Sequence, residues 1–161
     1  MRSKKLEKII VATGLGRLSQ DSQFEASILP EITKALSQIT GQKPSNCPAK
    51  KSIAGFKIRA GNLVGLKVTL RGKRMNDFLF RMINIVLPRV RDFRGIDPKQ
   101  IDEGGNLTIG FRDHNVFPEI SPEDSKHNFG LQVTLVSGLK DKREAYEFFK
   151  KIGVPLKEQN K

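Results

Sequence analysis

One long stretch of this chain contains no acidic side chain. The 45 residues between Glu31 and Asp77, called here the acid-free segment, hold ten Lys or Arg. The chain of 161 residues has a formal net charge of +12, so the segment carries ten of these charges and the other 116 residues carry +2. No carboxylate within the segment can neutralise them, and a local positive field favours a local negative partner.

The composition helps to decide whether the negative partner is nucleic acid or a membrane surface. With 37% hydrophobic and 29% charged residues, the chain is globular and long enough for one domain with a hydrophobic core, so we expect a single domain over residues 1–161. No apolar run approaches the roughly 20 residues that span a bilayer, and no lipidation motif appears. The single cysteine, Cys47, cannot form an internal disulfide, which fits a reducing cytoplasm. Nucleic acid is therefore favoured over a membrane surface.

The spacing of apolar residues predicts an α+β fold. Residues 7–16 indicate a strand that ends in a Gly-rich turn, and residues 21–39 a helix that is stopped by Gly41. Pro30 either kinks this helix or marks where its regular part begins. A strand at 63–72 precedes a helix over Met75–Leu87 that we expect Pro88 to close.

Two more strands and one more helix complete the expected order. Residues 106–112 and 131–136 alternate in polarity, and a last helix is capped by Asp141 and stopped by Gly153. We expect an antiparallel sheet with helices packed on one face and the other face open.

The outward positions of three strands carry donors, hydroxyls and positive charge. A polar outward face on one strand is ordinary wetted surface, but three such strands favour a docking surface for RNA. The outward residues are Lys67, Thr69, Arg71, Thr108, Arg112, Gln132 and Thr134.

A basic loop is expected at about residues 48–65. Lys50, Lys51, Lys57 and Arg59 lie there among three glycines, which let a backbone approach a phosphate closely. Phe56 either stacks on a base or anchors the loop in the core. The plainer alternative is a flexible hairpin with a solvated charge run.

A second basic cluster follows the end of the helix over Met75–Leu87. Arg89, Arg91 and Arg94 lie within six residues. One arginine would complement the helix dipole, at about 0.3–1 kcal/mol per charge. Guanidinium forks match phosphate oxygens, so we assign the three to RNA.

Catalytic motifs are weak. His114 and His127 lie in loop-like sequence, and with one cysteine they form no metal-ligand spacing, so we expect both at the surface and no metal or cofactor. Residues 14–19 lack the complete phosphate-loop patterns and are interpreted as a turn. Asp77 and Asp92 are each near arginines, where ion pairing is the simpler interpretation.

Five ordered blocks carry a family resemblance: ITGQKP at 39–44, AKKSIAGFKIRAG at 49–61, GLKVTLRGKRM at 65–75, LPRVRDFRGI at 87–96 and FPEI at 117–120. Together they resemble the large-subunit ribosomal protein family numbered five, the 5S rRNA-binding proteins of the central protuberance. The resemblance covers about residues 8–155 and implies a bacterial-type ribosome.

The resemblance implies four partners: 5S rRNA on the open sheet face, 23S rRNA, peptidyl-site tRNA at the basic loop, and a small-subunit head protein across the subunit interface. The family's 5S-contact positions match at Gln42 and Thr69. The predicted rRNA-binding residues are Gln42, Lys43, Lys67, Thr69, Arg71, Arg89, Arg91, Arg94, Thr108, Arg112, Gln132 and Thr134. The predicted tRNA-facing residues are Lys50, Lys51, Ser52, Lys57 and Arg59, and the intersubunit residues are Phe117, Pro118, Glu119 and Ile120.

The sequence departs from the family pattern at two places. Ala12 stands where the family usually has Asn, so one hydrogen bond is expected to be missing. The family usually begins with an additional helical segment, and what covers the surface of that helix here stays an open question. Ser45, where an aliphatic residue is more usual, is a minor difference.

Three function classes compete. A structural ribosomal RNA-binding protein without catalysis is the leading hypothesis. A free RNA-binding regulator shares its chemistry, and an RNA-processing enzyme would need a general base or a metal cluster in a basic cleft.

Overall fold

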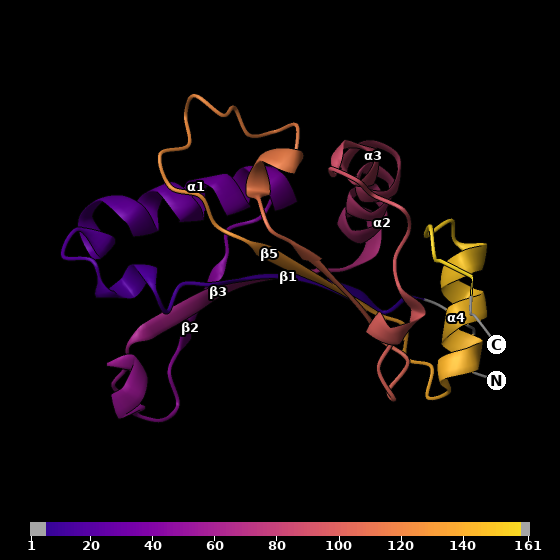
Figure 1. Ribbon diagram of the computed structural model, residues 1–161, viewed down its shortest axis with the longest axis horizontal. Coiled ribbons are helices and arrows are strands. Elements are labelled where there is room, and N and C mark those ends of the chain that lie inside the picture. The colour runs from indigo at the N-terminus through magenta and orange to yellow at the C-terminus, as the bar shows by residue number, and fades with distance from the viewer. Residues whose placement is uncertain (1–5, 159–161) are drawn as a thin grey trace. The chain divides into compact units, whose positions relative to one another are not determined.

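The computed structural model describes residues 6–158 and confirms the α+β fold. Five strands form one antiparallel sheet in the order β2-β3-β1-β5-β4. Short 3-10 and π turns lie between the main elements (Figure 1). The strands are β1 (Lys8–Gly14), β2 (Ser45–Pro48), β3 (Leu63–Leu70), β4 (Leu107–Phe111) and β5 (Leu131–Val136), and the helices are α1 (Leu29–Thr40), α2 (Gly72–Arg81), α3 (Leu87–Arg89) and α4 (Lys142–Lys151).

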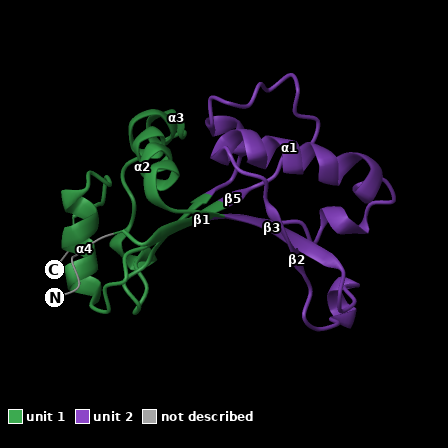
Figure 2. Cartoon of the chain, turned by 180° about the vertical axis from the view of Figure 1, so that it is seen from behind, with its two compact units in different colours: residues 1–10, 69–110, 132–161 green, residues 11–68, 111–131 purple. Residues whose placement is uncertain are grey.

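The chain divides into two compact units, shown in Figure 2. Unit 1 comprises residues 1–10, 69–110 and 132–161, and contains α2, α3 and α4. Unit 2 comprises residues 11–68 and 111–131, and contains α1 and β2. Strands β1 and β3 each contribute residues to both units. One domain over the whole chain stays a prediction.

Side chains along the strands alternate between core and surface as the sequence pattern predicts. In β3, Leu66, Val68 and Leu70 are buried, Lys67 is exposed and Thr69 is half-buried. The same alternation runs through β4 and β5. The apolar side of β3, β4 and β5 therefore builds the core, and the polar side faces out.

Both ends of α1 have local explanations. A π turn over Phe24–Ile28 precedes the helix, and Pro30 lies in its first turn, where no N–H partner is needed. Of the two alternatives for Pro30, the start of the regular helix is therefore correct. Gly41 ends the helix with φ 71°, a left-handed conformation that suits glycine.

The helix expected over Met75–Leu87 is segmented and extends further. A π turn over Met82–Val86 separates α2 from α3. Pro88 lies in the first turn of α3, so the prediction that it closes the helix was wrong. A proline is tolerated at the start of a helical segment because its missing N–H would be unpaired there. Val90, with ψ 129°, ends the helical path.

The last helix has the predicted caps. The Asp141 carboxylate accepts hydrogen bonds from the N–H groups of Arg143 and Glu144 at the start of α4. Gly153 follows the helix with φ 97°. Both features agree with the sequence signals for helix ends.

His114 is a core residue, so the prediction of a surface position was wrong. Its side chain is fully buried and stacks on Phe129, with ring centroids 4.0 Å apart. The Phe129 N–H donates to Nδ1 at 3.4 Å, and Nε2 lies 2.6 Å from Ser125 Oγ. Loop sequence hides this burial because the stacking partner lies fifteen residues further along the chain.

Glu31 of α1 forms hydrogen bonds to the loop that precedes β5. One carboxylate oxygen accepts from the N–H groups of Lys126 and His127 at 2.8 and 3.0 Å, and the other lies 2.8 Å from His127 Nδ1. Partial burial raises the pKa of Glu31, but the hydrogen bonds from His127 and Lys126 outweigh it and hold the pKa below its usual value of 4.5. The ionised carboxylate is thus part of the fold.

We expect Glu31→Gln to lower the free energy of unfolding at neutral pH by about 1–3 kcal/mol, because a charged acceptor of three hydrogen bonds is lost. A lowered folded-state pKa contributes stability above the unfolded value, near 4.5, which is lost as the pH falls through the folded value. Urea unfolding of the variant should therefore depend less on pH in the acid range than that of the parent protein. Glu25→Gln, at an exposed position in the preceding turn, is the control and should change neither quantity.

Candidate nucleic-acid interface

All ten basic side chains of the acid-free segment are exposed. Among residues 6–158, none of the ten lies within 4.0 Å of a carboxylate oxygen. Their charge is therefore compensated only by solvent and ions. The ten are Lys34, Lys43, Lys50, Lys51, Lys57, Arg59, Lys67, Arg71, Lys73 and Arg74.

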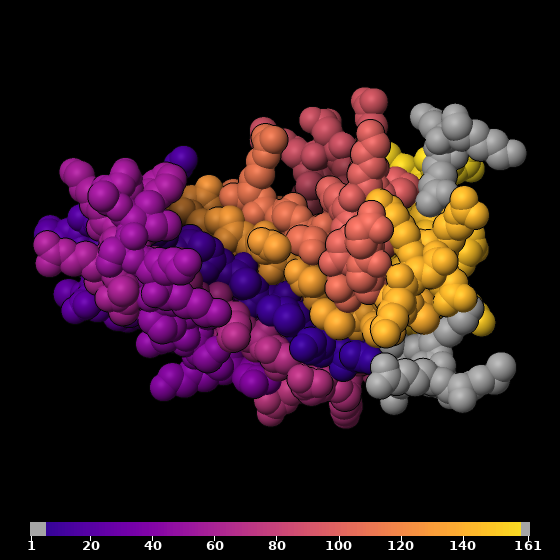
Figure 3. All heavy atoms as spheres, turned by 90° about the horizontal axis from the view of Figure 1, so that it is seen from below, coloured from indigo at the N-terminus to yellow at the C-terminus, as the bar shows by residue number. Residues whose placement is uncertain are grey.

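Strand β3 presents two of the predicted contact residues on its outward side. Lys67 is exposed, and Thr69 follows two residues later on the same side of the strand. Ser45 of β2 pairs with Lys67, and its hydroxyl donates to the Lys67 carbonyl at 3.2 Å. Arg71 is exposed where the strand passes into α2. Figure 3 shows the atoms of β1 in a row on this side, uncovered by any helix.

In unit 1, two strands add hydroxyls and an amide. The Thr108 and Thr134 hydroxyls lie 3.3 Å apart across β4 and β5, and both residues are half-buried. Gln132 is exposed on β5. A side-chain carbon at Gly110 would meet nothing within 4 Å, so the outward side of β4 is open at this point. In unit 2, Arg112 is exposed directly after β4.

The turn after α1 holds Gln42 half-buried and Lys43 exposed. Thr40 Oγ1 lies 3.0 Å from the Gln42 carbonyl oxygen and 3.3 Å from its N–H nitrogen. The backbone of Gln42 is therefore fixed at the helix end by a buried hydroxyl.

The segment expected as a loop at 48–65 is a small hairpin, visible at the ends of β2 and β3 (Figure 1). Backbone bonds join Ala49 to Asn62, and Ile53 pairs with Ile58. Ser52 Oγ accepts from the Ala60 N–H at 2.9 Å, so this hydroxyl is engaged within the hairpin. The basic residues Lys50, Lys51, Lys57 and Arg59 are all exposed.

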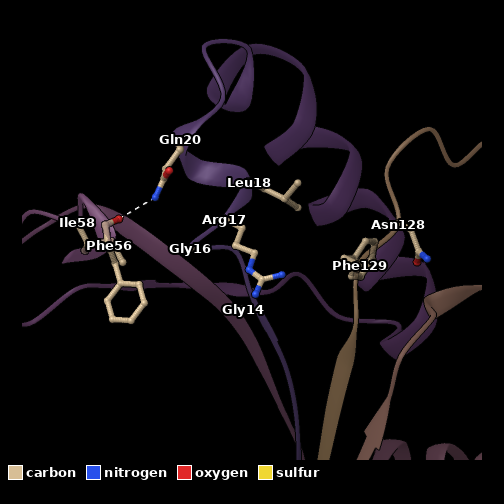
Figure 4. A pocket seen from close by; sticks show the side chains of 9 residues that line it. All are labelled: Gly14, Gly16, Arg17, Leu18, Gln20, Phe56, Ile58, Asn128 and Phe129. Atoms are coloured by element: carbon tan, nitrogen blue, oxygen red, sulfur yellow. Dashed lines mark hydrogen bonds between the residues drawn. The ribbon is translucent and has the colours of Figure 1, made fainter. Parts of the chain in front are cut away.

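A cavity of about 510 Å³ lies between this hairpin and the turn after β1 (Figure 4). Gln20 Nε2 donates to the Phe56 carbonyl at 2.7 Å and ties the two together. The Phe56 ring is 65% exposed, so the alternative that it anchors the hairpin in the core was wrong. The lining residues are Gly14, Gly16, Arg17, Leu18, Gln20, Phe56, Ile58, Asn128 and Phe129.

The arginine turn, residues 89–95, presents three guanidinium groups. Arg89, Arg91 and Arg94 are exposed around the end of α3. Asp92 adopts φ 54° and Gly95 φ 100°, so the chain reverses sharply here. The turn therefore projects basic side chains from a compact backbone.

Residues 113–125 have the opposite charge pattern. They contain Asp113, Glu119, Glu123 and Asp124 and neither Lys nor Arg. Phe117 and Ile120 are 2% and 7% exposed, so these two predicted contact residues anchor the segment in the core. Pro118 is exposed and Glu119 is half-buried, whereas Glu123 and Asp124 are exposed.

Two other kinds of feature are absent from residues 6–158. No group of three His, Cys, Asp or Glu side chains there is arranged to hold a metal ion. No described helix has the length and apolar character needed to cross a membrane.

Sequence reasoning missed Arg17 and Asn128 at the cavity, because only the fold brings these turns together. It also missed β2, whose polar residues Ser45–Pro48 show no apolar alternation. Its pairing with β3 gives the strand its place.

Comparison with known proteins agrees with the resemblance. Residues 1–59 match the family described as Ribosomal protein L5, and residues 63–156 match the C-terminal part of the same ribosomal family. A relative from Halothermothrix orenii, Large ribosomal subunit protein uL5, is 44% identical over 156 residues, 97% of this chain and 85% of its own length. Relatives of the same name from Leptospira biflexa (44%, covering 100% and 86%) and Pseudothermotoga lettingae (46%, covering 95% and 81%) are also similar.

Similarity along nearly the entire length excludes the enzyme hypothesis, because this family is structural. The chain therefore belongs to the ribosomal protein L5 family and is a structural, non-enzymatic constituent of the large ribosomal subunit.

Proposed function

We propose that this chain binds 5S rRNA through the outward side of its sheet and contacts 23S rRNA through neighbouring basic residues. The observation that carries the proposal is that all ten cations of the acid-free segment are exposed and none lies within 4.0 Å of a carboxylate oxygen of residues 6–158. The phosphate backbone is the partner that gains most from such a surface, because each neutralised phosphate releases condensed counterions.

The sheet side and the hairpin differ in the contacts they offer. Lys67 and Thr69 lie on a strand whose other side is packed in the core, so they suit a stationary RNA. The hairpin presents four cations and the exposed Phe56 ring, on which a base can stack. We assign the sheet side to 5S rRNA and the hairpin to peptidyl-site tRNA.

The acidic segment 113–125 suits a different partner. Four carboxylates in a segment that contains neither Lys nor Arg repel phosphate and attract a basic protein surface. Its buried Phe117 and Ile120 hold the segment in place, and Pro118 is exposed between them. This supports a contact with a basic protein of the small-subunit head, rather than with RNA.

The first RNA-binding prediction concerns the effect of salt on affinity. If about six phosphates are contacted, the logarithm of 5S rRNA affinity should fall with the logarithm of salt concentration with a slope of roughly −4 to −5. Filter binding or fluorescence anisotropy at several salt concentrations measures the slope. A slope near zero would refute the electrostatic interface.

The second prediction concerns Thr69. Thr69→Val keeps the shape and the β-branched character of the side chain and removes an outward hydroxyl, so a polar group of the RNA loses its partner. We expect 5S rRNA affinity to fall by about 1–3 kcal/mol while the melting temperature stays nearly constant. Thr33→Val, on α1, is the control and should leave RNA affinity unchanged. Unchanged affinity together with impaired folding would make Thr69 structural.

The third prediction separates the hairpin from the sheet side. Replacing Lys50, Lys51, Lys57 and Arg59 with Ala should leave folding and most 5S rRNA binding intact, because no backbone bond of the hairpin depends on these side chains. Ribosomes that carry this variant should release peptidyl-site tRNA faster.

The matched variant for this comparison is Lys67→Ala with Arg71→Ala, which should lose 5S rRNA affinity. Equal loss of 5S rRNA binding by both variants would contradict the assignment of two targets.

A further inference from the structure

The C-terminal segment Val154–Lys157 pairs with the chain directly after the arginine turn. The Ile96 N–H donates to the Pro155 carbonyl at 2.8 Å, and the Lys157 N–H donates to the Ile96 carbonyl at 2.9 Å. The two stretches run parallel, with Ile96 opposite Leu156. Ile96 and Val154 are each 3% exposed, so the pairing rests on the core of unit 1.

Two further contacts hold this C-terminal segment, called here the tail, against the arginine turn. The Tyr146 hydroxyl of α4 donates to the Lys157 carbonyl at 3.2 Å. A side-chain carbon at Gly95 would lie 3.1 Å from Lys157 Cγ and 3.4 Å from both the Lys157 nitrogen and the Pro155 oxygen. Glycine at 95, with φ 100°, is therefore what lets the tail lie this close.

The turn that the tail braces has the chemistry of an anion site. Residues 91 and 92 form a turn, and among residues 6–158 no backbone carbonyl accepts from the N–H groups of Arg94 and Gly95. Arg89, Arg91 and Arg94 surround these donors, and Lys157 is exposed beside Gly95. Guanidinium forks beside these two successive N–H groups favour phosphate oxygens, and Asp92 is the acid within the turn.

We propose that Val154–Lys157 is a positioning element for the arginine turn and that Lys157 is a further contact to the phosphate backbone of ribosomal RNA. The inference rests on the proposed rRNA-binding function. It adds a C-terminal segment that lies outside the five sequence blocks between residues 39 and 120 that carry the family resemblance. A turn held by two backbone bonds loses less conformational freedom on binding than a free turn, so its arginines bind more tightly.

Two variants of Lys157 in the full chain separate the effect of its charge from the effect of its backbone hydrogen bond to Ile96. Lys157→Ala removes the cation and keeps the N–H bond to Ile96, whereas Lys157→Pro removes both. Lys140→Ala, which removes one cation just before the opposite end of α4, is the control. The probes are 5S rRNA and 23S rRNA, each alone, with affinity measured at several salt concentrations. Hydrogen exchange of the free protein reports on the Ile96 amide.

Lys157→Ala should make the salt slope shallower by about 0.7–0.9 on one of the two RNAs, the value for one phosphate contact. Lys157→Pro should speed exchange at Ile96 and make the slope shallower by at least twice as much, because the arginines lose their fixed positions. Lys140→Ala should match the parent protein, and circular dichroism should show all three variants folded.

The outcomes separate this inference from the function on which it rests. Equal slopes for Lys157→Pro and Lys157→Ala would overturn the positioning role. An unchanged slope for Lys157→Ala, or an equal change for Lys140→Ala, would overturn the phosphate contact. A parent slope near zero on both RNAs would instead overturn the proposed rRNA binding itself.

Discussion

The lack of acidic side chains between Glu31 and Asp77 is the constraint on which the surface of this protein depends. A buried charge without a partner is costly, so each of the ten cations must reach solvent. Strand β3 meets this requirement by alternation, with Leu66 and Val68 in the core and Lys67 outside. The hairpin at 49–62 meets it by leaving the core altogether. One charge pattern thus fixes both the direction of a strand's side chains and the exposure of a hairpin.

The opposite pattern at 113–125 gives the molecule a second kind of surface. Four carboxylates and neither Lys nor Arg lie within this segment, which is held by buried Phe117, His114 and Ile120. Like charges would weaken binding of this segment to RNA by several kcal/mol at close range. Charge is therefore segregated along the chain, and under the proposed function the basic regions meet phosphate and the acidic segment meets a basic protein.

Features set by local sequence were predictable, and features set by distant contacts were not. Strand alternation, the Asp141 cap and the stops at Gly41 and Gly153 follow from neighbouring residues. The helix end was predicted wrongly at Pro88, because a π turn precedes this residue and Pro88 lies in the first turn of α3. The burial of His114 depends on Phe129, and the cavity depends on a turn and a hairpin that meet only in the fold. The exposed cations were predicted because charge is read directly from sequence, whereas the partners that brace them are not.

Three exposed segments are each held by hydrogen bonds from a distant part of the chain. The Gln20 amide holds the hairpin at the Phe56 carbonyl, Glu31 holds the segment before β5 at two N–H groups, and the C-terminal tail holds the arginine turn at Ile96. In each case hydrogen bonds to backbone hold the segment, and the exposed cations of the hairpin and of the arginine turn take no part in these bonds. A structural protein needs no reactive group to be specific, because the spacing of its charges selects the spacing of phosphates or of a complementary protein. Specificity in this fold therefore depends on the hydrogen bonds that hold the exposed segments as much as on the cations. Loss of the Gln20 bond or of the tail's bonds to Ile96 should weaken binding without removing any charge.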